Sequence, residues 1–365
     1  MDTLLHTPAS YLIGAAVWTL SGIVSLFLLL TQLRRRKQLR RRLHVVRAGL
    51  SLWCLLAALT TCEFAFAVWY DQTDSIMLTN ASKRWVDIHV TYTRDEFRDD
   101  RRPSDSLQTQ PKDGRRRIVF AGDSFTFGHG IRNVDDRFSN LVRSKLELQA
   151  SGPCDVINVG LLGAGIDRIS EVVHKQFRAG LSADTVVYVY CLNDIERLNP
   201  ELADELFWDI GRSNPSFFLF RDTYFFNFLY FRFRQYRLPA IRNYYGFVDE
   251  LYDSEHFETL GGKITRFRNI CSAYGAELRI AVFPFVHNLG PDYPFLDAHE
   301  KLAQFCQSQS IPVLDLEPVL RPYSPAKLMV NRYDAHPNEF ANQLVADAML
   351  APDAEFLKVR DTAVR

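Results

Sequence analysis

The stretch Arg117-Ile-Val-Phe-Ala-Gly-Asp-Ser-Phe-Thr-Phe-Gly-His-Gly130 predicts a buried strand that turns sharply into a helix. Four apolar residues, 118–121, form the strand pattern, and Gly122 permits backbone angles that are closed to other residues. Ser124 follows at the carboxyl end of the strand, the edge at which open α/β sheets bind ligands. Its hydroxyl is therefore a candidate nucleophile, and the alternative is a serine that only caps the helix.

Strand and helix patterns alternate through most of the chain after residue 117. Continuous apolar runs such as Thr185-Val-Val-Tyr-Val-Tyr190 predict strands buried on both faces, as in a parallel sheet. We expect strands at 117–121, 155–159, 185–191, 278–284 and 312–315, and helices at 137–149, 167–179, 256–274, 297–309 and 337–350. This alternation predicts a three-layer α/β/α domain over residues 116–352.

An aromatic segment interrupts the alternation between about residues 200 and 250. It contains Phe217-Phe-Leu-Phe and Tyr224-Phe-Phe-Asn-Phe-Leu-Tyr-Phe-Arg-Phe233. The segment is too long for a simple connection between strands, so we interpret it as a helical insertion. Core packing by an extra helix, a lid over the active site and a surface against a bilayer are the three alternatives.

Two apolar stretches precede the α/β pattern, at 11–33 and about 48–70. Each is long enough, as a helix, to span roughly 30 Å of hydrocarbon. The segment 34–47 between them carries eight Lys and Arg residues and no acid. A signal peptide would place its basic residues before the apolar run, so residues 1–70 instead predict a two-helix transmembrane hairpin. The positive-inside rule places the basic loop in the cytoplasm and everything after Tyr70 outside it.

One acidic residue, Glu63, lies within the second apolar stretch. A carboxylate that faces lipid is costly, so Glu63 is expected to face the other helix, a partner protein or the interface region. Packing against Thr60 and Thr61 is an equally open alternative. The polar composition of residues 71–115 predicts a loosely ordered connector, with a short edge strand at Trp85–Tyr92.

The overall charge gives no sign of a nucleic-acid partner, since 43 basic residues balance 43 acidic ones. Six cysteines are present, without a CxxC or His-rich spacing that would predict a metal site. Cys154 and Cys191 are expected at opposite ends of their strands, which argues against a bond between them. Cys271 and Cys306 both fall late in helices that precede strands, and a disulfide between them is left open.

Three further polar stretches fall where the predicted sheet would bring them close to Ser124. They are Asn158-Val-Gly-Leu-Leu-Gly-Ala-Gly165 after the second strand, Cys191-Leu-Asn-Asp194 after the third, and Asp334-Ala-His-Pro-Asn338 before the last helix. Each alone is an ordinary turn or helix cap. Because all of them are expected at the same sheet edge, together they favour a functional site.

With these four blocks in this order, residues 116–350 resemble the SGNH/GDSL hydrolase family. The resemblance implies Ser124 as the nucleophile and His336 as the general base, with Asp334 orienting the histidine. It also implies an oxyanion hole formed by the N–H groups of Ser124 and Gly163 and by the side-chain amide of Asn193.

Two positions depart from the pattern of the family. Cys191 replaces the usual glycine of the third block, and one residue rather than two separates Asp334 from His336. The shorter spacing resembles that of polysaccharide acetyltransferase relatives, and Tyr333 occupies the place of the acid in the longer spacing. His129, near Ser124 in the sequence, is interpreted as a surface or loop histidine.

These residues are suited to acyl transfer, because a serine hydroxyl becomes a strong nucleophile only when a base takes its proton. The resemblance implies a membrane-anchored serine esterase outside the cytoplasm of a bacterial inner membrane, without a cofactor or metal. Its expected substrates are O-acyl esters, O-acetyl esters of envelope or exported polysaccharide foremost. A polysaccharide O-acetyltransferase that meets a membrane acyl-donor protein is one alternative, and a non-catalytic glycan-binding or scaffold module is another.

Overall fold

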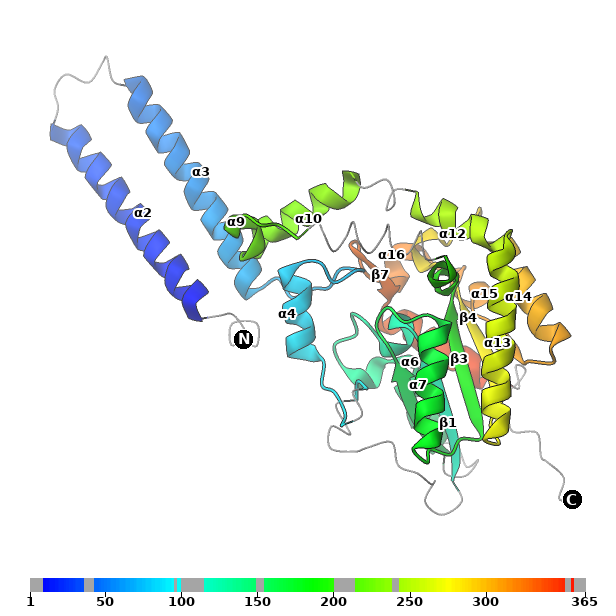
Figure 1. The fold of residues 1–365 in the computed structure, drawn as a ribbon. Coiled ribbons are helices and arrows are strands. Elements are labelled where there is room, and N and C mark those ends of the chain that lie inside the picture. The colour runs from blue at the N-terminus through cyan, green and yellow to red at the C-terminus, as the bar shows by residue number, and fades with distance from the viewer. Residues whose placement is uncertain are drawn as a thin grey trace, which may run out of the picture. The chain divides into compact units, whose positions relative to one another are not determined.

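A five-stranded parallel sheet forms the centre of the α/β part of this computed structural model (Figure 1). Its strands are β1 (Arg116–Gly122), β2 (Cys154–Gly160), β3 (Thr185–Cys191), β4 (Glu277–Phe283) and β5 (Val313–Asp315). They are arranged in the order β2-β1-β3-β4-β5, and every pair is parallel. The direction of the strand order changes at β1, so the carboxyl ends of β1 and β3 meet at the position where doubly wound sheets bind ligands.

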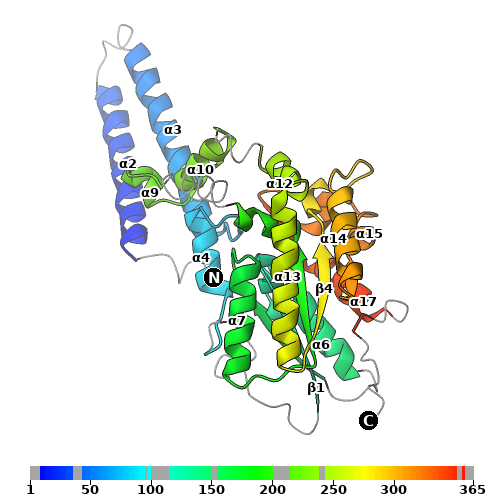
Figure 2. The ribbon, with the colours of Figure 1, turned by 45° about the vertical axis from the view of Figure 1, so that its right-hand side comes forward.

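Helices cover both faces of this sheet (Figures 1 and 2). On one side α7 (Ile166–Arg178) packs beside α13 (Glu255–Ala273), and α14 (Leu296–Ser308) lies next to β5. On the other side α6 (Phe138–Leu148) packs against α17 (Glu339–Leu350). The predicted three-layer α/β/α architecture is confirmed, and the predicted strands and helices lie within about two residues of those observed.

Short elements at the carboxyl edge of the sheet complete this part of the chain. They are α5 (Ser124–Phe127), η3 (Val134–Asp136), η4 (Leu192–Leu198), α12 (Tyr244–Tyr252), η5 (Val286–Asn288), α15 (Glu317–Leu320), α16 (Pro325–Leu328) and the antiparallel pair β6 (Met329–Asn331) and β7 (Asp334–Pro337). All seven residues of β3 are buried. A buried apolar side chain contributes roughly 1.5–3 kcal/mol to folding, so strands of this kind form the core of the domain.

The structure describes residues 9–35, 43–94, 97–99, 115–148, 154–199, 214–237, 243–351 and 356–357. The chain divides into two compact units, which we treat separately. The first comprises residues 1–72, 76–88 and 213–235, and the second, which contains the sheet, comprises 73–75, 89–212 and 236–365. The boundaries 1–70, 71–115 and 116–352 given by the sequence remain predictions.

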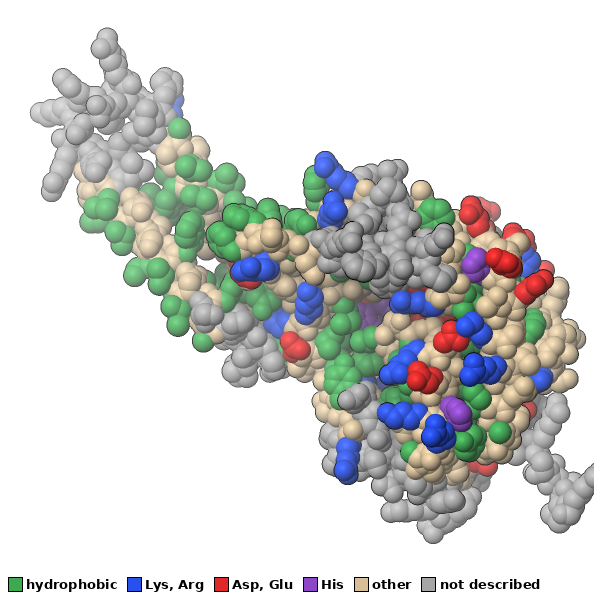
Figure 3. Space-filling model, viewed as in Figure 1, with side chains coloured by type: hydrophobic (Ala, Val, Ile, Leu, Met, Phe, Trp, Pro, Cys, Tyr) green, Lys and Arg blue, Asp and Glu red, His purple; other side chains and the backbone are tan. Residues whose placement is uncertain are grey.

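The first unit contains two long apolar helices, α2 (Ala9–Arg35) and α3 (Leu43–Val68). Both contain a window apolar enough to cross a membrane, at Tyr11–Leu28 and Arg47–Val68, and almost none of either window is buried. Hydrophobic side chains cover the visible face of these helices (Figure 3). The unit also contains nearly all of α4 (Asn80–His89), α9 (Phe218–Arg221) and most of α10 (Phe225–Arg237). The described residues of the aromatic segment are thus largely helical, as predicted.

The strand predicted at Trp85–Tyr92 is wrong, because residues 80–89 form the helix α4. The buried positions Ala81, Arg84 and Trp85 are spaced three and four residues apart, which is the period of a helix and not of a strand. Loose order is likewise wrong for part of the connector. Arg98 is 1% exposed, and its guanidinium donates to the carbonyl oxygens of Gly128 and Ile131.

The disulfide considered between Cys271 and Cys306 is not formed. All six cysteines belong to the described residues, and all six are free thiols. Both side chains are buried, and burial raises the pKa of each thiol to about 12. A buried thiol of this kind acts as a small hydrophobic group in the core.

Candidate active site

The turn after β1 holds Ser124 at the start of a single helical turn, α5. A Cβ atom on Gly122 would lie 2.6 Å from the carbonyl oxygen of Val189 on the neighbouring strand, so only glycine fits there. The Asp123 carboxylate accepts a hydrogen bond from the N–H of Phe125 at 2.9 Å and caps α5. Gly128, with φ at +75°, ends the turn in the left-handed conformation. These features fix the backbone that carries the serine hydroxyl.

A chain of hydrogen bonds links three of the predicted site residues across 212 positions of the sequence. Nε2 of His336 lies 2.8 Å from Oγ of Ser124, and Nδ1 of His336 lies 2.5 Å from Oδ1 of Asp334. Asp334 and His336 both lie on β7, and Asp334 also accepts from the backbone N–H of His336 at 3.2 Å. The short Asp-x-His spacing therefore lets this carboxylate reach the imidazole, and Tyr333 is not needed in that place.

The second oxygen of Asp334 is held by residues that the sequence analysis did not select. Thr73 donates its hydroxyl to Oδ2, and Nε2 of His129 lies 3.4 Å from the same oxygen. Nε2 of His129 is also 3.1 Å from the carbonyl oxygen of Asp74. Asp334 is fully buried, so four contacts from three segments of the chain fix its carboxylate.

His129 lies in the turn that follows α5, but it is buried and is not a surface histidine. It is 1% exposed, and its ring lies 4.6 Å from that of His336 between centroids. Its position five residues after Ser124 was the only feature of the sequence that indicated a place for His129 in the site. The sequence gave no indication that Thr73 and Asp74 contribute to the site, because they belong to a polar segment about 260 residues before β7.

The electrostatics of the site favour an ion pair between Asp334 and His336. Burial alone lowers the pKa of His336, but the charge and hydrogen bond of Asp334 outweigh it and raise the pKa above 6.5. Burial likewise raises the pKa of Asp334, yet the two neighbouring imidazoles and the hydroxyl of Thr73 hold it well below its ordinary value. The pKa of His129 is lowered, chiefly by burial, so this second imidazole tends to stay neutral.

Two buried carboxyl groups lie behind the serine turn. Burial raises the pKa of Asp123 to about 6, although the N–H of Phe125 acts in the opposite direction. Burial and the neighbouring charge of Asp123 raise the pKa of Asp194 well above its ordinary value. Asp194 accepts a hydrogen bond of 2.6 Å from the hydroxyl of Tyr188. The charge of Asp123 in turn raises the pKa of His336 further.

The two remaining predicted residues, Gly163 and Asn193, follow the strands on either side of β1. Gly163 has φ at +64°, and its carbonyl oxygen accepts from Arg197 at 2.7 Å. Asn193 is the second residue of η4, which directly follows β3, and it is partly buried. Residues 161–168, Arg197 and Leu198 line a hollow of about 440 Å³ that contains Gly163. Their part in an oxyanion hole remains a prediction.

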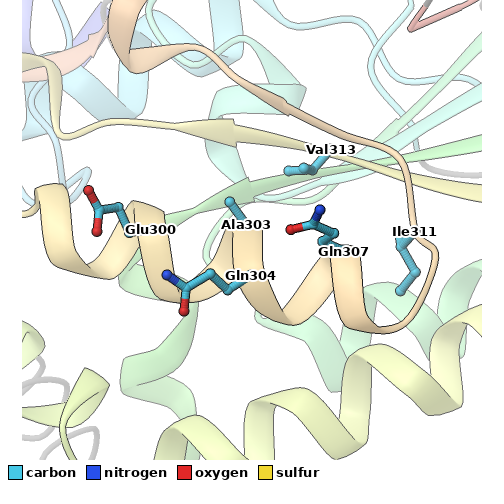
Figure 4. A pocket seen from close by; sticks show the side chains of 6 residues that line it. All are labelled: Glu300, Ala303, Gln304, Gln307, Ile311 and Val313. Atoms are coloured by element: carbon cyan, nitrogen blue, oxygen red, sulfur yellow. The ribbon is translucent and has the colours of Figure 1, made fainter.

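A second hollow, of about 400 Å³, is lined by α14 and by Ile311 and Val313 after it, and none of the predicted site residues line it (Figure 4). Ligating atoms of His129, Asp334 and His336 lie within 4.8 Å of one another, a spacing that would also suit a metal ion. Both ring nitrogens of His336 are, however, engaged with Asp334 and Ser124, as a general base requires. The absence of a metal and of a cofactor from the reaction stays a prediction.

No family model matches the chain, and no curated protein matches it. A lipolytic protein of the G-D-S-L family from Veillonella parvula is 14% identical, covers 64% of this chain and 96% of its own, and has a TM-score of 0.37. An acetylxylan esterase from Geobacillus stearothermophilus is 15% identical, with 69% and 99% covered and a TM-score of 0.41. A two-domain esterase active on acetylated mannans is 13% identical, with 68% and 51% covered and a TM-score of 0.41.

The first of these solved structures is described as a lipolytic protein of the G-D-S-L family, and the other two are described as esterases. Similarity at this level leaves the roles of residues and the substrate to be argued from the site itself.

Proposed function

We propose that this chain is a serine esterase of the SGNH type that cleaves O-acyl esters through an acyl-serine intermediate. The observation that carries the proposal is the line of hydrogen bonds from Ser124 through His336 to Asp334. A hydroxyl, an imidazole and a buried carboxylate in this order are the groups that nucleophilic acyl transfer needs.

The proposed reaction begins when Oγ of Ser124 attacks the carbonyl carbon of the ester and its proton moves to Nε2 of His336. The buried carboxylate of Asp334 stabilises the imidazolium and holds its tautomer. The N–H groups of Ser124 and Gly163 and the amide of Asn193 would stabilise the oxyanion. Collapse of the intermediate releases the alcohol, which takes the proton from His336, and water then cleaves the acyl-serine in the same way.

We further propose that two membrane spans at residues 1–70 anchor this site outside the cytoplasm of a bacterial inner membrane. Two helices of sufficient length and apolar surface support the anchor, and the basic segment 34–47 between them supports the orientation. An enzyme in that position meets envelope and exported polysaccharide, so O-acetyl groups on carbohydrate are the substrates we favour. A second candidate is O-acetyl transfer to a sugar hydroxyl, which the Asp334–His336 spacing favours.

Turnover of an acetyl ester by the purified full-length chain tests the esterase proposal. Ser124→Ala should abolish turnover and labelling by a fluorophosphonate, whereas Ser308→Ala, at an exposed serine on α14, should change neither. Asn193→Ala should lower kcat by about 10²–10³-fold, the usual effect of losing one oxyanion donor. An unlabelled but folded wild-type chain would contradict the proposal and favour a non-catalytic binding module.

Product analysis separates the two enzymatic candidates. The reaction is run with an acetyl ester alone and with an added oligosaccharide acceptor. A hydrolase releases acetate at the same rate in both cases, whereas a transferase forms acetylated oligosaccharide at the expense of acetate, since water and the sugar hydroxyl compete for one acyl-serine.

A further inference from the structure

The carboxylate of Glu63 connects the second apolar helix to the aromatic segment within the first unit. Glu63 lies five residues before the end of α3 at Val68, about 8 Å along the helix axis. It accepts hydrogen bonds from the N–H groups of Tyr224 at 2.6 Å, Phe225 at 2.8 Å and Phe226 at 3.3 Å. The carboxylate thus satisfies donors at the start of α10, so its charge faces polypeptide rather than lipid.

Further polar contacts hold the aromatic segment at this end of α3. The guanidinium of Arg84 donates to the carbonyl oxygens of Ala67, Phe66 and Tyr70, and it lies 4.2 Å from the ring centroid of Tyr224. Both views show α9 and α10 near the carboxyl end of α3 (Figures 1 and 2). The depth of these short helices relative to the apolar helix is therefore set by buried polar groups.

Several large apolar side chains at the start of α9 and on α10 are exposed. Phe217, Phe218, Leu229 and Phe233 have exposed fractions of 53%, 61%, 43% and 62%. Leu229 and Phe233 are four residues apart and so share one face of α10. The exposed Arg234 follows directly. Aromatic and leucine side chains beside arginine are typical of helices that lie in the interface plane of a bilayer.

The end of the second apolar helix has the composition of a membrane interface. Trp69 directly follows α3 and is 72% exposed, and its ring packs edge-to-face with that of Phe64 at 6.3 Å. Tryptophan and tyrosine are enriched where a span leaves the hydrocarbon, and Tyr70 is the next residue. The basic segment 34–47 includes the first five residues of the same helix, at its opposite end.

We propose that α9 and α10 form an interfacial helical pair, with Phe217, Phe218, Leu229 and Phe233 inserted into the outer leaflet of the bilayer. This proposal rests on the proposed membrane anchor, because Glu63 fixes where α10 lies relative to the end of α3 and so how deep it lies in the bilayer. A bilayer is the occupant that the contacts favour, because α10 packs on the end of an apolar helix: the ring of Phe66 on α3 lies 5.1 Å from that of Phe225 and 5.3 Å from that of Phe228. Arginine beside the buried face then meets the lipid phosphates.

Fluorescence of a polarity-sensitive probe tests the proposal with the full chain in lipid nanodiscs. One cysteine at a time is introduced as Phe218→Cys or Phe233→Cys in a Cys54→Ser, Cys62→Ser background, in which the four remaining cysteines are buried. Each introduced cysteine is labelled with a nitrobenzoxadiazole dye. We expect blue-shifted emission at both positions and strong quenching by lipids that carry a nitroxide near the headgroup. Lipids with a nitroxide deep in the acyl chain should quench both probes less.

Two control positions separate failure of this proposal from failure of the membrane anchor. Ile23→Cys, in the middle of the first apolar helix, should be quenched best by the deep nitroxide, and the exposed Leu148→Cys by neither. Water-like, unquenched probes at 218 and 233 beside a quenched probe at 23 would overturn the interfacial pair alone. Blue-shifted but unquenched probes there would overturn it too, since a protein surface would then cover the face. An unquenched probe at 23 would overturn both proposals.

Discussion

The charge on Asp334 controls the protonation of His336, and this has a measurable consequence for activity. In the proposed reaction His336 must be neutral to accept the proton of Ser124, and Asp334 raises the pKa of His336 above its ordinary value. We therefore expect kcat/KM to fall as the pH drops through that raised pKa. Below it the imidazole is charged and cannot act as a base.

Asp334→Asn should lower kcat on the order of 10⁴-fold, as in other Ser-His-Asp sites. It should also move the acidic limb of the pH profile of kcat/KM to lower pH. Burial, which lowers the pKa of His336, would then be opposed only by the weaker influence of Asp123 and Asp74. The pH dependence of kcat/KM for both chains is the measurement. An acidic limb that stays in place after the substitution would mean that Asp334 does not tune the base.

Thr73 is expected to act on catalysis through Asp334. Thr73→Val removes the hydroxyl that donates to Oδ2 and leaves a buried carboxylate oxygen with one donor fewer. The expected cost is about 1–3 kcal/mol in the free energy of unfolding, together with a lower kcat. Urea unfolding and ester turnover measure the two effects. Thr73→Ser, which keeps the hydroxyl, should restore both, and a serine variant as impaired as the valine variant would argue for a packing role.

The close approach of α5 to β2 depends on a residue without a side chain. A Cβ atom on Gly160 would lie 2.2 Å from the backbone nitrogen of Phe127 and 2.5 Å from the carbonyl carbon of Thr126. Backbone cannot move aside as a flexible side chain does, so Gly160→Ala must displace the turn that carries Ser124. We expect a loss of about 1–3 kcal/mol in stability and a strong loss of turnover.

Gly262→Ala is the matched control, because Gly262 lies in the helix α13 with nothing within 4 Å of the added atom. Alanine there should stabilise the chain by roughly 0.5–1 kcal/mol and leave turnover unchanged. Thermal unfolding and ester hydrolysis by both variants give the comparison. Equal activity of the two variants would show that the α5–β2 contact does not position the serine.

The orientation of the whole chain across the membrane can be read with an impermeant maleimide. Leu148→Cys, 87% exposed on the unit that contains the sheet, should be labelled from the outer side of the inner membrane. Gln38→Cys, in the basic segment 34–47, should be labelled only after the membrane is opened, because the positive-inside rule keeps that segment in the cytoplasm. The reverse pattern of labelling would invert the proposed topology.

Local sequence patterns were sufficient to predict the main strands and helices of the larger unit. Continuous apolar runs such as 185–190 predict strands buried on both faces, and a strand that ends in Gly-Asp-Ser predicts the turn. These signals lie within a few neighbouring residues, so no contact from elsewhere in the chain is needed to read them. The strand predicted at Trp85–Tyr92 was wrong because it, too, was read from a few neighbouring residues. That stretch fits a strand pattern but is too short to reveal the period of the helix α4.

The sequence by itself determined the α/β/α sheet, the two long apolar helices and the residues Ser124, Asp334 and His336, since each has a local signature. Only the tertiary structure decided that Thr73 and His129 hold the second oxygen of Asp334 and that Glu63 caps the aromatic helix α10. The reason is physical: a hydrogen bond between distant segments depends on where folding places the two groups, and the residues next to each group do not identify its bonding partner.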